Sequence, residues 1–328
     1  MLAAALDRLL DRSVVPGYTR IGLAVRRRLD GWPADPLSLS GQTALVTGGT
    51  AGIGRAAASG IARLGATVVI VGRDPQRGAD AARTIAAEAG GADVRFERCD
   101  LGRLADVRAL AARLTAGGAP IRLLVHDAGV MPPERTLTAE GHELAFAVNV
   151  LGPFLLTALL EPVLRAAAPA RMIVVSSGGM YAQRLDVADP TSASGRYRPA
   201  AVYARTKRAE VVLAEQWAAR WRGTGVAAHA MHPGWADTGG VRDALPGFHR
   251  LMGPLLRTAE QAADTIVWLA GAPADELASG GFWHDRRRRP THRLRRTRES
   301  AAERAALWDL CRRASGWTDD QAVAGRSS

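Results

Sequence analysis

Short runs rich in β-branched residues alternate with alanine-rich amphipathic stretches through the middle of this 328-residue chain. Such alternation predicts parallel strands joined by right-handed helical crossovers, because each helix must bury its apolar face against the sheet. The predicted strands are residues 43–47, 67–71, 94–97, 121–126, 172–176 and 226–231. The predicted helices are residues 54–64, 76–89, 103–116, 138–166, 200–221 and 258–270. The sequence therefore predicts an α/β fold with a doubly wound parallel sheet, in a single domain over residues 38–285.

A glycine-rich turn, TGGTAGIG at residues 47–54, joins the first predicted strand to the first predicted helix. Gly48, Gly52 and Gly54 lack side chains where the chain turns tightly, where a pyrophosphate approaches the backbone, and where helix packs on strand. A flexible glycine turn is the alternative, but the position inside a βαβ unit favours dinucleotide binding. Thr50 and Ile53, within the same turn, are also expected to contact the cofactor.

Residues at the end of the second predicted strand bear on the choice of cofactor. Arg73 is the first charged residue there and can pair with a 2′-phosphate, whereas an acid would accept hydrogen bonds from a 2′-hydroxyl. Arg55 is a possible second contact. Asp74 is either the ribose acceptor or the cap of the next helix, ahead of Pro75. We therefore predict NADP(H) in preference to NAD(H).

Lys207 is the only lysine among the 43 basic residues, and it follows Tyr203 by four positions. Residues four apart lie on the same face of a helix. A neighbouring ammonium favours phenolate, so the pair predicts a Tyr203 pKa lowered from about 10 toward neutrality, as a general acid/base requires. The alternative is a chance pair on a solvated helix.

The glycine turn, the serine pair at 176–177 and YARTK at 203–207 together resemble the short-chain dehydrogenase/reductase family, whose members have a Rossmann fold. The resemblance implies that Tyr203 is the acid/base and that Lys207 holds the nicotinamide ribose. It also implies that Ser177 polarises the substrate carbonyl and that Asn149 anchors a water in the proton relay. Taken singly, Asn149 could be a helix residue bonded to local backbone, and either serine could simply end a strand.

The resemblance implies further cofactor contacts after the third, fourth and sixth strands. They are Asp100 and Leu101, Ala128 and Gly129, and Pro233, Gly234 and Thr238. Asp127 departs from the family, which usually has asparagine there. An aspartate carboxylate cannot donate as an amide does, so the contacts at that position are in doubt.

Three downstream stretches, residues 176–180, 202–218 and 232–249, resemble the group typified by family member 12. The long insertion between Ser177 and Tyr203 is expected to form one wall of a substrate pocket, and residues 235–256 its lid. Apolar side chains in both segments favour a hydrophobic carbonyl or alcohol substrate. They are Met180, Tyr181, Trp235, Phe248, Leu251 and Met252. Packing in the core or between subunits is the alternative for them.

The net charge of +11 is concentrated in the flanks, with eight arginines and no acid between residues 286 and 298. Residues 1–37 are predicted to form an amphipathic helical extension, suited to a membrane interface or to packing on the domain or on another subunit. Residues 286–328 are predicted to be an arginine-rich segment and a C-terminal helix or tail. Such runs are usually solvated, and without interleaved aromatic residues this one predicts no specific nucleic-acid partner.

Two cysteines, no signal-peptide pattern and no apolar run long enough to span a membrane predict a protein of the reducing cytoplasm, with membrane association left open. No metal site is expected. The predicted function is NADP(H)-dependent interconversion of a carbonyl and an alcohol. The alternative is a non-catalytic dinucleotide-binding sensor or a membrane-peripheral interaction protein. The resemblance also implies a homo-oligomer, paired through the helices that carry Asn149 and Tyr203.

Overall fold

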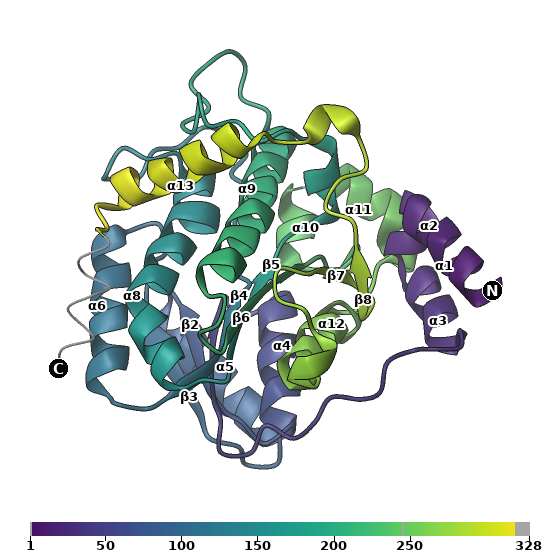
Figure 1. Cartoon of the computed structure of the whole chain (residues 1–328), viewed down its shortest axis with the longest axis horizontal. Coiled ribbons are helices and arrows are strands. Elements are labelled where there is room, and N and C mark those ends of the chain that lie inside the picture. The colour runs from purple at the N-terminus through teal and green to yellow at the C-terminus, as the bar shows by residue number, and fades with distance from the viewer. Residues whose placement is uncertain (1, 245, 319–328) are drawn as a thin grey trace.

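The computed structural model describes residues 2–244 and 246–318, which fold around one eight-stranded sheet (Figure 1). The strand order is β3-β2-β1-β4-β5-β6-β7-β8, and only the last pair is antiparallel. The strands are β1 (Thr43–Thr47), β2 (Thr67–Gly72), β3 (Val94–Arg98), β4 (Ile121–His126), β5 (Ala170–Val175), β6 (Val226–Met231), β7 (Phe282–His284) and β8 (Arg287–Arg289). The prediction of a doubly wound parallel sheet is confirmed.

Helices cover both faces of the sheet, as the alternating sequence requires. One face carries α4 (Gly52–Arg63), α5 (Pro75–Glu88) and α12 (Ala259–Gly271). The other carries α6 (Leu104–Ala116), α8 (Gly152–Ala166) and α9 (Pro199–Arg220). Shorter elements are α7 (Leu144–Phe146), the π-helical turn η1 (Ala147–Leu151), α10 (Gly239–Ala244), α11 (Pro246–Met252), and the 3₁₀ turns η2 (Gly178–Ala182), η3 (Gly253–Leu255), η4 (Ala274–Glu276) and η5 (Arg295–Thr297).

The arginine run begins as part of the sheet, because β8 pairs with β7 in a tight hairpin. Asp285 and Arg286 form its turn with φ values of 50° and 55°, a left-handed conformation that non-glycine residues rarely adopt. Arg286 is buried and pairs with Asp264 at 2.9 Å. The hairpin crosses the predicted boundary at residue 285. The expectation of a solvated run is wrong for Arg286 and Arg289, which are 8% and 7% exposed. Residues 319–328 of the predicted tail lie outside the described residues.

Buried ion pairs bind the N-terminal helices α1 (Leu2–Arg12), α2 (Val14–Tyr18) and α3 (Arg20–Arg28) to this hairpin. Arg26 is fully buried and contacts Asp7 at 3.0 Å and Asp285 at 2.6 Å. Asp7 also accepts from Arg289 at 2.8 Å, and Asp285 from Arg257 at 2.6 Å. Breaking one such buried pair leaves an uncompensated charge, so the cluster fixes the extension on the domain.

The C-terminal helix α13 (Ala301–Ser315) lies across α8 and α9 (Figure 1). Trp308 packs edge-on against Phe154 of α8 and Trp217 of α9, with ring centroids 5.0 and 4.8 Å apart. We expected a second copy of the chain to pair through these two helices. Where α13 crosses them, however, their outer face is covered by α13 of the same chain.

Among the described residues, one continuous helical stretch, Leu144–Ala166, is long and apolar enough to cross a membrane, although no such run was expected. It comprises α7, η1 and α8, and 83% of its apolar 18-residue segment is buried inside the fold. The stretch is therefore apolar because it is a core helix between the sheet and α13.

Candidate active site

The ends of β1, β4, β5 and β6 meet at the carboxyl edge of the sheet, where the chain order reverses between β1 and β4. Doubly wound folds bind ligands in the crevice at this switch point, because the loops there diverge to opposite faces. The glycine turn follows β1, Asp127 follows β4, Ser177 follows β5 and Pro233 follows β6. Most of the predicted site residues are therefore gathered at one edge.

The glycine turn has the geometry of a dinucleotide cradle. Gly48 has a φ of 73°, and a Cβ on it would lie 2.8 Å from the Ala128 nitrogen. A Cβ on Gly54 would lie 2.4 Å from the Gly48 oxygen. The helix α4 starts at Gly52 behind Ala51, whose methyl group cannot cap the first N–H groups, and among these groups the Gly54 N–H donates to Asp127. These residues fit a bound dinucleotide phosphate.

Thr238 lies opposite the turn. A Cβ built on Gly52 would lie 3.5 Å from the Thr238 Cγ2, so Thr238 lies close to the turn. On the other side of the turn, Thr50 contacts Gly72 at the end of β2, and Ile53 packs against the core beneath α4. The cradle thus connects the second strand to the segment after β6.

The residues expected to select the cofactor have distinct surroundings. Asp74 caps α5, accepting from the Arg77 nitrogen at 3.1 Å, so the capping alternative describes it in this structure. Arg73 is exposed. Arg55 is paired with Glu88 of the neighbouring helix α5. The Glu88 carboxylate would compete with a cofactor phosphate for Arg55.

At the predicted cofactor contacts after β3 and β6, mostly backbone atoms are placed to meet a cofactor. Asp100 accepts from the Gly102 nitrogen at 2.9 Å, which closes a local turn after β3, and the Leu101 side chain is buried in the core. Gly234 has a φ of 78° and lies against the Tyr18 carbonyl and the Arg257 guanidinium. The N-terminal extension therefore supports the Pro233–Gly234 turn from behind.

Tyr203 and Lys207 are neighbours on α9, with the ammonium 5.4 Å from the centre of the phenol ring. Lys207 is 2% exposed and donates to the Val175 carbonyl at 3.0 Å and to Glu210 Oε1 at 2.8 Å. A Cβ on Gly129 would lie 3.2 Å from the Lys207 nitrogen. The ammonium therefore lies against the backbone that is expected to receive the cofactor.

The expected lowering of the Tyr203 pKa is wrong for the protein without cofactor. Burial raises this pKa, Lys207 lowers it, and the carboxylates Glu210 and Asp127 raise it further, so the net direction is upward. The prediction considered Lys207 alone and overlooked the two acids around it. Glu210 could have been found, because it follows Lys207 by three positions and shares its helix face.

The two adjacent serines have different partners. Ser176 is buried, and its hydroxyl donates to the Lys207 carbonyl at 2.7 Å, so it fixes β5 to α9. Ser177 is partly exposed and accepts from the Gly179 nitrogen at 3.2 Å. Because the Ser177 oxygen is used here as an acceptor, its O–H proton remains available to a substrate oxygen.

Asn149 lies in the π-helical turn η1, a distortion common at functional sites. Its amide accepts from the Val130 nitrogen at 2.8 Å and donates to the Val130 carbonyl at 3.0 Å. The amide also donates to Thr206 Oγ1 at 2.9 Å. Asn149 thus joins the loop after β4 to the turn of α9 between Tyr203 and Lys207.

Of the apolar residues expected to line the substrate pocket, some are buried in the core and others lie at the surface. Met180 and Tyr181 are buried in the core, so the packing alternative describes them. Trp235 contacts Tyr18 and Phe248, with ring centroids 6.0 and 5.0 Å apart. Leu251 is 79% exposed, and Met252 is partly exposed. The apolar side chains accessible near the site therefore belong to the segment after β6.

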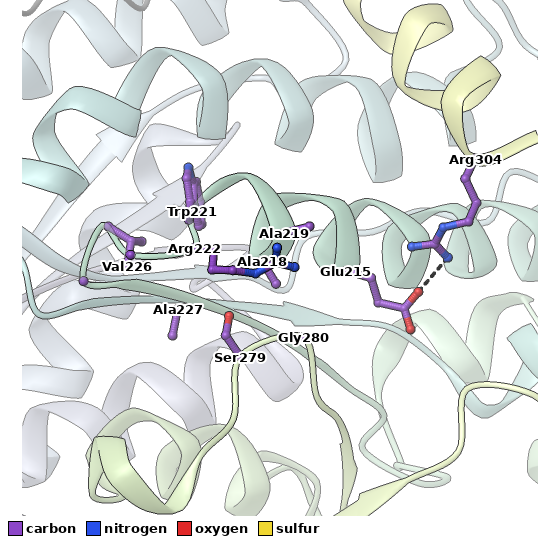
Figure 2. A pocket seen from close by; sticks show the side chains of 12 residues that line it. Glu215, Ala218, Ala219, Trp221, Arg222, Val226, Ala227, Ser279, Gly280 and Arg304 are labelled. Carbon is purple, nitrogen blue, oxygen red and sulfur yellow. Dashed lines mark hydrogen bonds and ion pairs between the residues drawn. The ribbon is translucent and has the colours of Figure 1, made fainter. Parts of the chain in front are cut away.

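A cleft of about 570 Å³ lies near the far end of α9, about 18 Å or more along the helix from Tyr203. Figure 2 shows its lining, in which Glu215 and Arg304 point toward one another and pair at 2.7 Å. The cleft contains none of the predicted site residues. Among the described residues, no group of three His, Cys, Asp or Glu side chains could hold a metal ion.

The fold and the cradle define a dinucleotide-binding α/β protein with a tyrosine–lysine pair at its switch point. Residues 42–246 match the family model described as short chain dehydrogenase. The chain belongs to the short-chain dehydrogenase/reductase family, and it is an NAD(P)-dependent oxidoreductase.

Several named proteins are similar to this chain. Dehydrogenase/reductase SDR family member 12 of Bos taurus is 41% identical over 276 residues, covering 84% of this chain and 86% of the relative. Polyprenol dehydrogenase of Mus musculus is 39% identical over 293 residues, with the same coverage of 84% and 86%. The structure of Pseudomonas aeruginosa RhlG with NADP in its active site has a TM-score of 0.62 and 27% identity, over 76% of this chain and 96% of that one. The resemblance to the member 12 group is confirmed.

Proposed function

We propose that this enzyme interconverts a carbonyl and an alcohol on a hydrophobic substrate, with NADP(H) as cofactor and Tyr203 as acid/base. The observation that carries the proposal is the Lys207 ammonium, buried between the Tyr203 ring and the Gly129 backbone. NADPH oxidation with a panel of aldehydes, ketones, retinoids and sterols tests it. Turnover that requires Tyr203 is expected, and absence of turnover with every compound would favour the non-catalytic sensor.

The proposed mechanism assigns one task to each side chain. Bound at the glycine turn and Lys207, a nicotinamide cofactor would supply hydride-transfer chemistry at the substrate carbon. Ser177 donates to the substrate oxygen, which stabilises the charge that develops there. Tyr203 gives its proton to that oxygen in reduction and removes it in oxidation. Lys207 holds the nicotinamide ribose, and Asn149 holds the α9 turn between Tyr203 and Lys207 and orders the proton relay.

Replacement of Arg73 by alanine is expected to weaken NADPH binding about tenfold and to leave NADH binding unchanged, because a charge-assisted bond to the 2′-phosphate is lost. Titration of both reduced cofactors, followed by tryptophan fluorescence, measures this. Arg83→Ala, an exposed arginine on α5, is the control. Tighter binding of NADH than NADPH by the unaltered protein would contradict the cofactor assignment.

The N-terminal helices support a membrane-peripheral location. Their two acids, Asp7 and Asp11, face inward to the arginine hairpin, so the exposed charges between residues 2 and 29 are all arginine. The exposed apolar side chains beside them are Leu2, Leu9, Val14, Val15 and Ile21. A cationic and apolar surface suits an anionic lipid interface. Trp235 contacts both α2 and α11, so this surface adjoins the proposed lid, where a membrane-dissolved substrate would enter.

We expect the protein to sediment with vesicles of phosphatidylcholine and phosphatidylserine but not with phosphatidylcholine alone. Charge reversal at Arg8 and Arg12 together should reduce partitioning at least about tenfold, because each arginine near the surface contributes about 1 kcal/mol. The same reversal at Arg83 and Arg95, exposed elsewhere on the domain, should have no effect. Equal sedimentation of the two double variants would refute contact through the N-terminal helices.

A further inference from the structure

The Lys207 ammonium is associated with two carboxylates that come from different parts of the fold, of which Glu210 is buried and Asp127 is partly exposed. Glu210, on the next turn of α9, pairs with it at 2.8 Å, and the two side chains are 3% and 5% exposed. Asp127, after β4, lies beneath the glycine turn and accepts a hydrogen bond from the backbone of Gly54. Asp127 is also close enough to Lys207 for a Coulombic interaction. With both acids ionised, the cluster carries more negative than positive charge.

Stability alone does not explain these acids. Glu210 Oε2 is buried, and no described residue forms a hydrogen bond with it. A single buried acid already compensates one ammonium, and each additional buried charge costs desolvation energy. An amide at either position would fill nearly the same volume without that cost. The arrangement therefore points to an electrostatic effect on a neighbouring residue. That residue is Tyr203, which interacts with the charges of Lys207, Glu210 and Asp127.

We propose that Asp127 and Glu210 are positioning residues that offset the Lys207 charge beside Tyr203 and thereby extend toward alkaline pH the range in which Tyr203 keeps the proton that carbonyl reduction needs. This inference rests on the proposed role of Tyr203. In reduction, the carbonyl carbon gains a hydride, the oxygen gains the phenolic proton, and the resulting phenolate recovers a proton from solvent. In oxidation, Tyr203 must begin as phenolate. The acids do not change the reaction equilibrium, but they set the pH range in which each form of Tyr203 is present.

The sign of the effect follows from the charges that face Tyr203. Lys207 favours phenolate, whereas Glu210 and Asp127 disfavour it and raise the pKa. The groups nearby on β5 and η1, Ser176 and Asn149, are neutral. Arg208 points to another side of α9, where it pairs with Glu299 at 2.7 Å.

Asp127 and Glu210 are both ionised at the pH at which Tyr203 would lose its proton. Burial raises the pKa of Asp127 and of Glu210 to about 7. Tyr203 begins above its ordinary value of about 10, so both acids are ionised at the alkaline pH where Tyr203 would lose its proton. Removal of either acid should therefore lower the pH at which phenolate forms.

Phenolate absorbance in the near ultraviolet, measured on the cofactor-free protein, tests this. Subtracting the titration of each matching Tyr203→Phe protein removes the signals of Tyr18, Tyr181 and Tyr197. Glu210→Gln and Asp127→Asn are each expected to move the Tyr203 midpoint down by about one pH unit, and the double variant further. Glu215→Gln, farther along α9 and paired with Arg304, should leave it in place.

A second readout is the pH dependence of all-trans-retinal reduction by NADPH, whose alkaline limb should move downward with the same variants. A Tyr203 midpoint that is unchanged or raised in both single variants would overturn the inference. If one variant fails to fold, the other carries the test, because the acids lie on separate elements. Turnover that survives in Tyr203→Phe would instead overturn the proposed function, so the two failures are distinguishable.

Discussion

Replacing Tyr203 by phenylalanine is expected to lower kcat by about 10³-fold, because a positioned acid/base contributes about 10²- to 10⁴-fold to such a reaction. The substitution removes one hydroxyl oxygen and keeps the ring, which lies 5.4 Å from the Lys207 ammonium. The contacts of Lys207 with Val175 and Glu210 do not involve that hydroxyl. Cofactor affinity should therefore remain within about twofold of the unaltered protein, as measured by fluorescence titration.

Tyr197→Phe is a matched control for this prediction. Tyr197 lies just before α9, and its hydroxyl donates to Glu143 at 3.0 Å rather than to a predicted catalytic residue. Loss of this hydrogen bond to a carboxylate should cost about 1.5–3 kcal/mol of folding free energy, and because the acid/base is kept, kcat should fall far less than in Tyr203→Phe. Equal kcat values for the Tyr203→Phe and unaltered proteins would exclude Tyr203 as the acid/base.

The central sheet could be predicted because its strands carry local signals. The bounds of β1, β4 and β6 agree with the predicted ranges, and β5 begins two residues before its predicted start. Most of these strands are short, mainly apolar runs, and β2 (TVVIVG) is the clearest example. Parallel order then followed from the intervening helices, because a crossover helix leaves few other arrangements.

The β7–β8 hairpin was missed because its strands have three residues each and β8 consists of arginine. Its position depends on partners far away in the chain. Arg289 meets Asp7, and Asp285 meets Arg26 and Arg257. A charge run has the same sequence signature whether solvent or buried carboxylates surround it. Only the tertiary structure distinguishes the two cases.

The position of the candidate site at one edge of the sheet could be predicted from the sequence, but its electrostatics could not. The motif drew attention to Tyr203 and Lys207, and the structure places them side by side. The sign of the Tyr203 pKa depends also on burial, on Glu210 and on Asp127. In the sequence Asp127 stands out only as a departure from the family, since nothing there shows that the loop after β4 brings it near α9.

Exchange of Lys207 for arginine is expected to lower kcat/KM by about 10²-fold even though the positive charge is kept. The ammonium lies 3.0 Å from the Val175 carbonyl and 2.8 Å from Glu210, and even a Cβ built on Gly129 would lie only 3.2 Å from it. A planar guanidinium is wider than an ammonium, so it must displace the backbone that would receive the cofactor. Overpacking of this kind also costs about 1–3 kcal/mol of folding stability.

Steady-state kinetics over a range of NADPH concentrations, together with thermal unfolding, separates these two effects. Arg205→Lys, the opposite exchange two positions earlier on the same helix, is the control, because Arg205 is partly exposed and pairs with Asp186 at 3.2 Å. That control should retain kcat/KM within about twofold, since surface ion pairs contribute at most about 1 kcal/mol. A folded Lys207→Arg protein with unaltered kcat/KM would show that charge alone suffices at this position. A folded but impaired protein would show that the compact ammonium is required, which accounts for the single lysine in a chain that otherwise uses arginine.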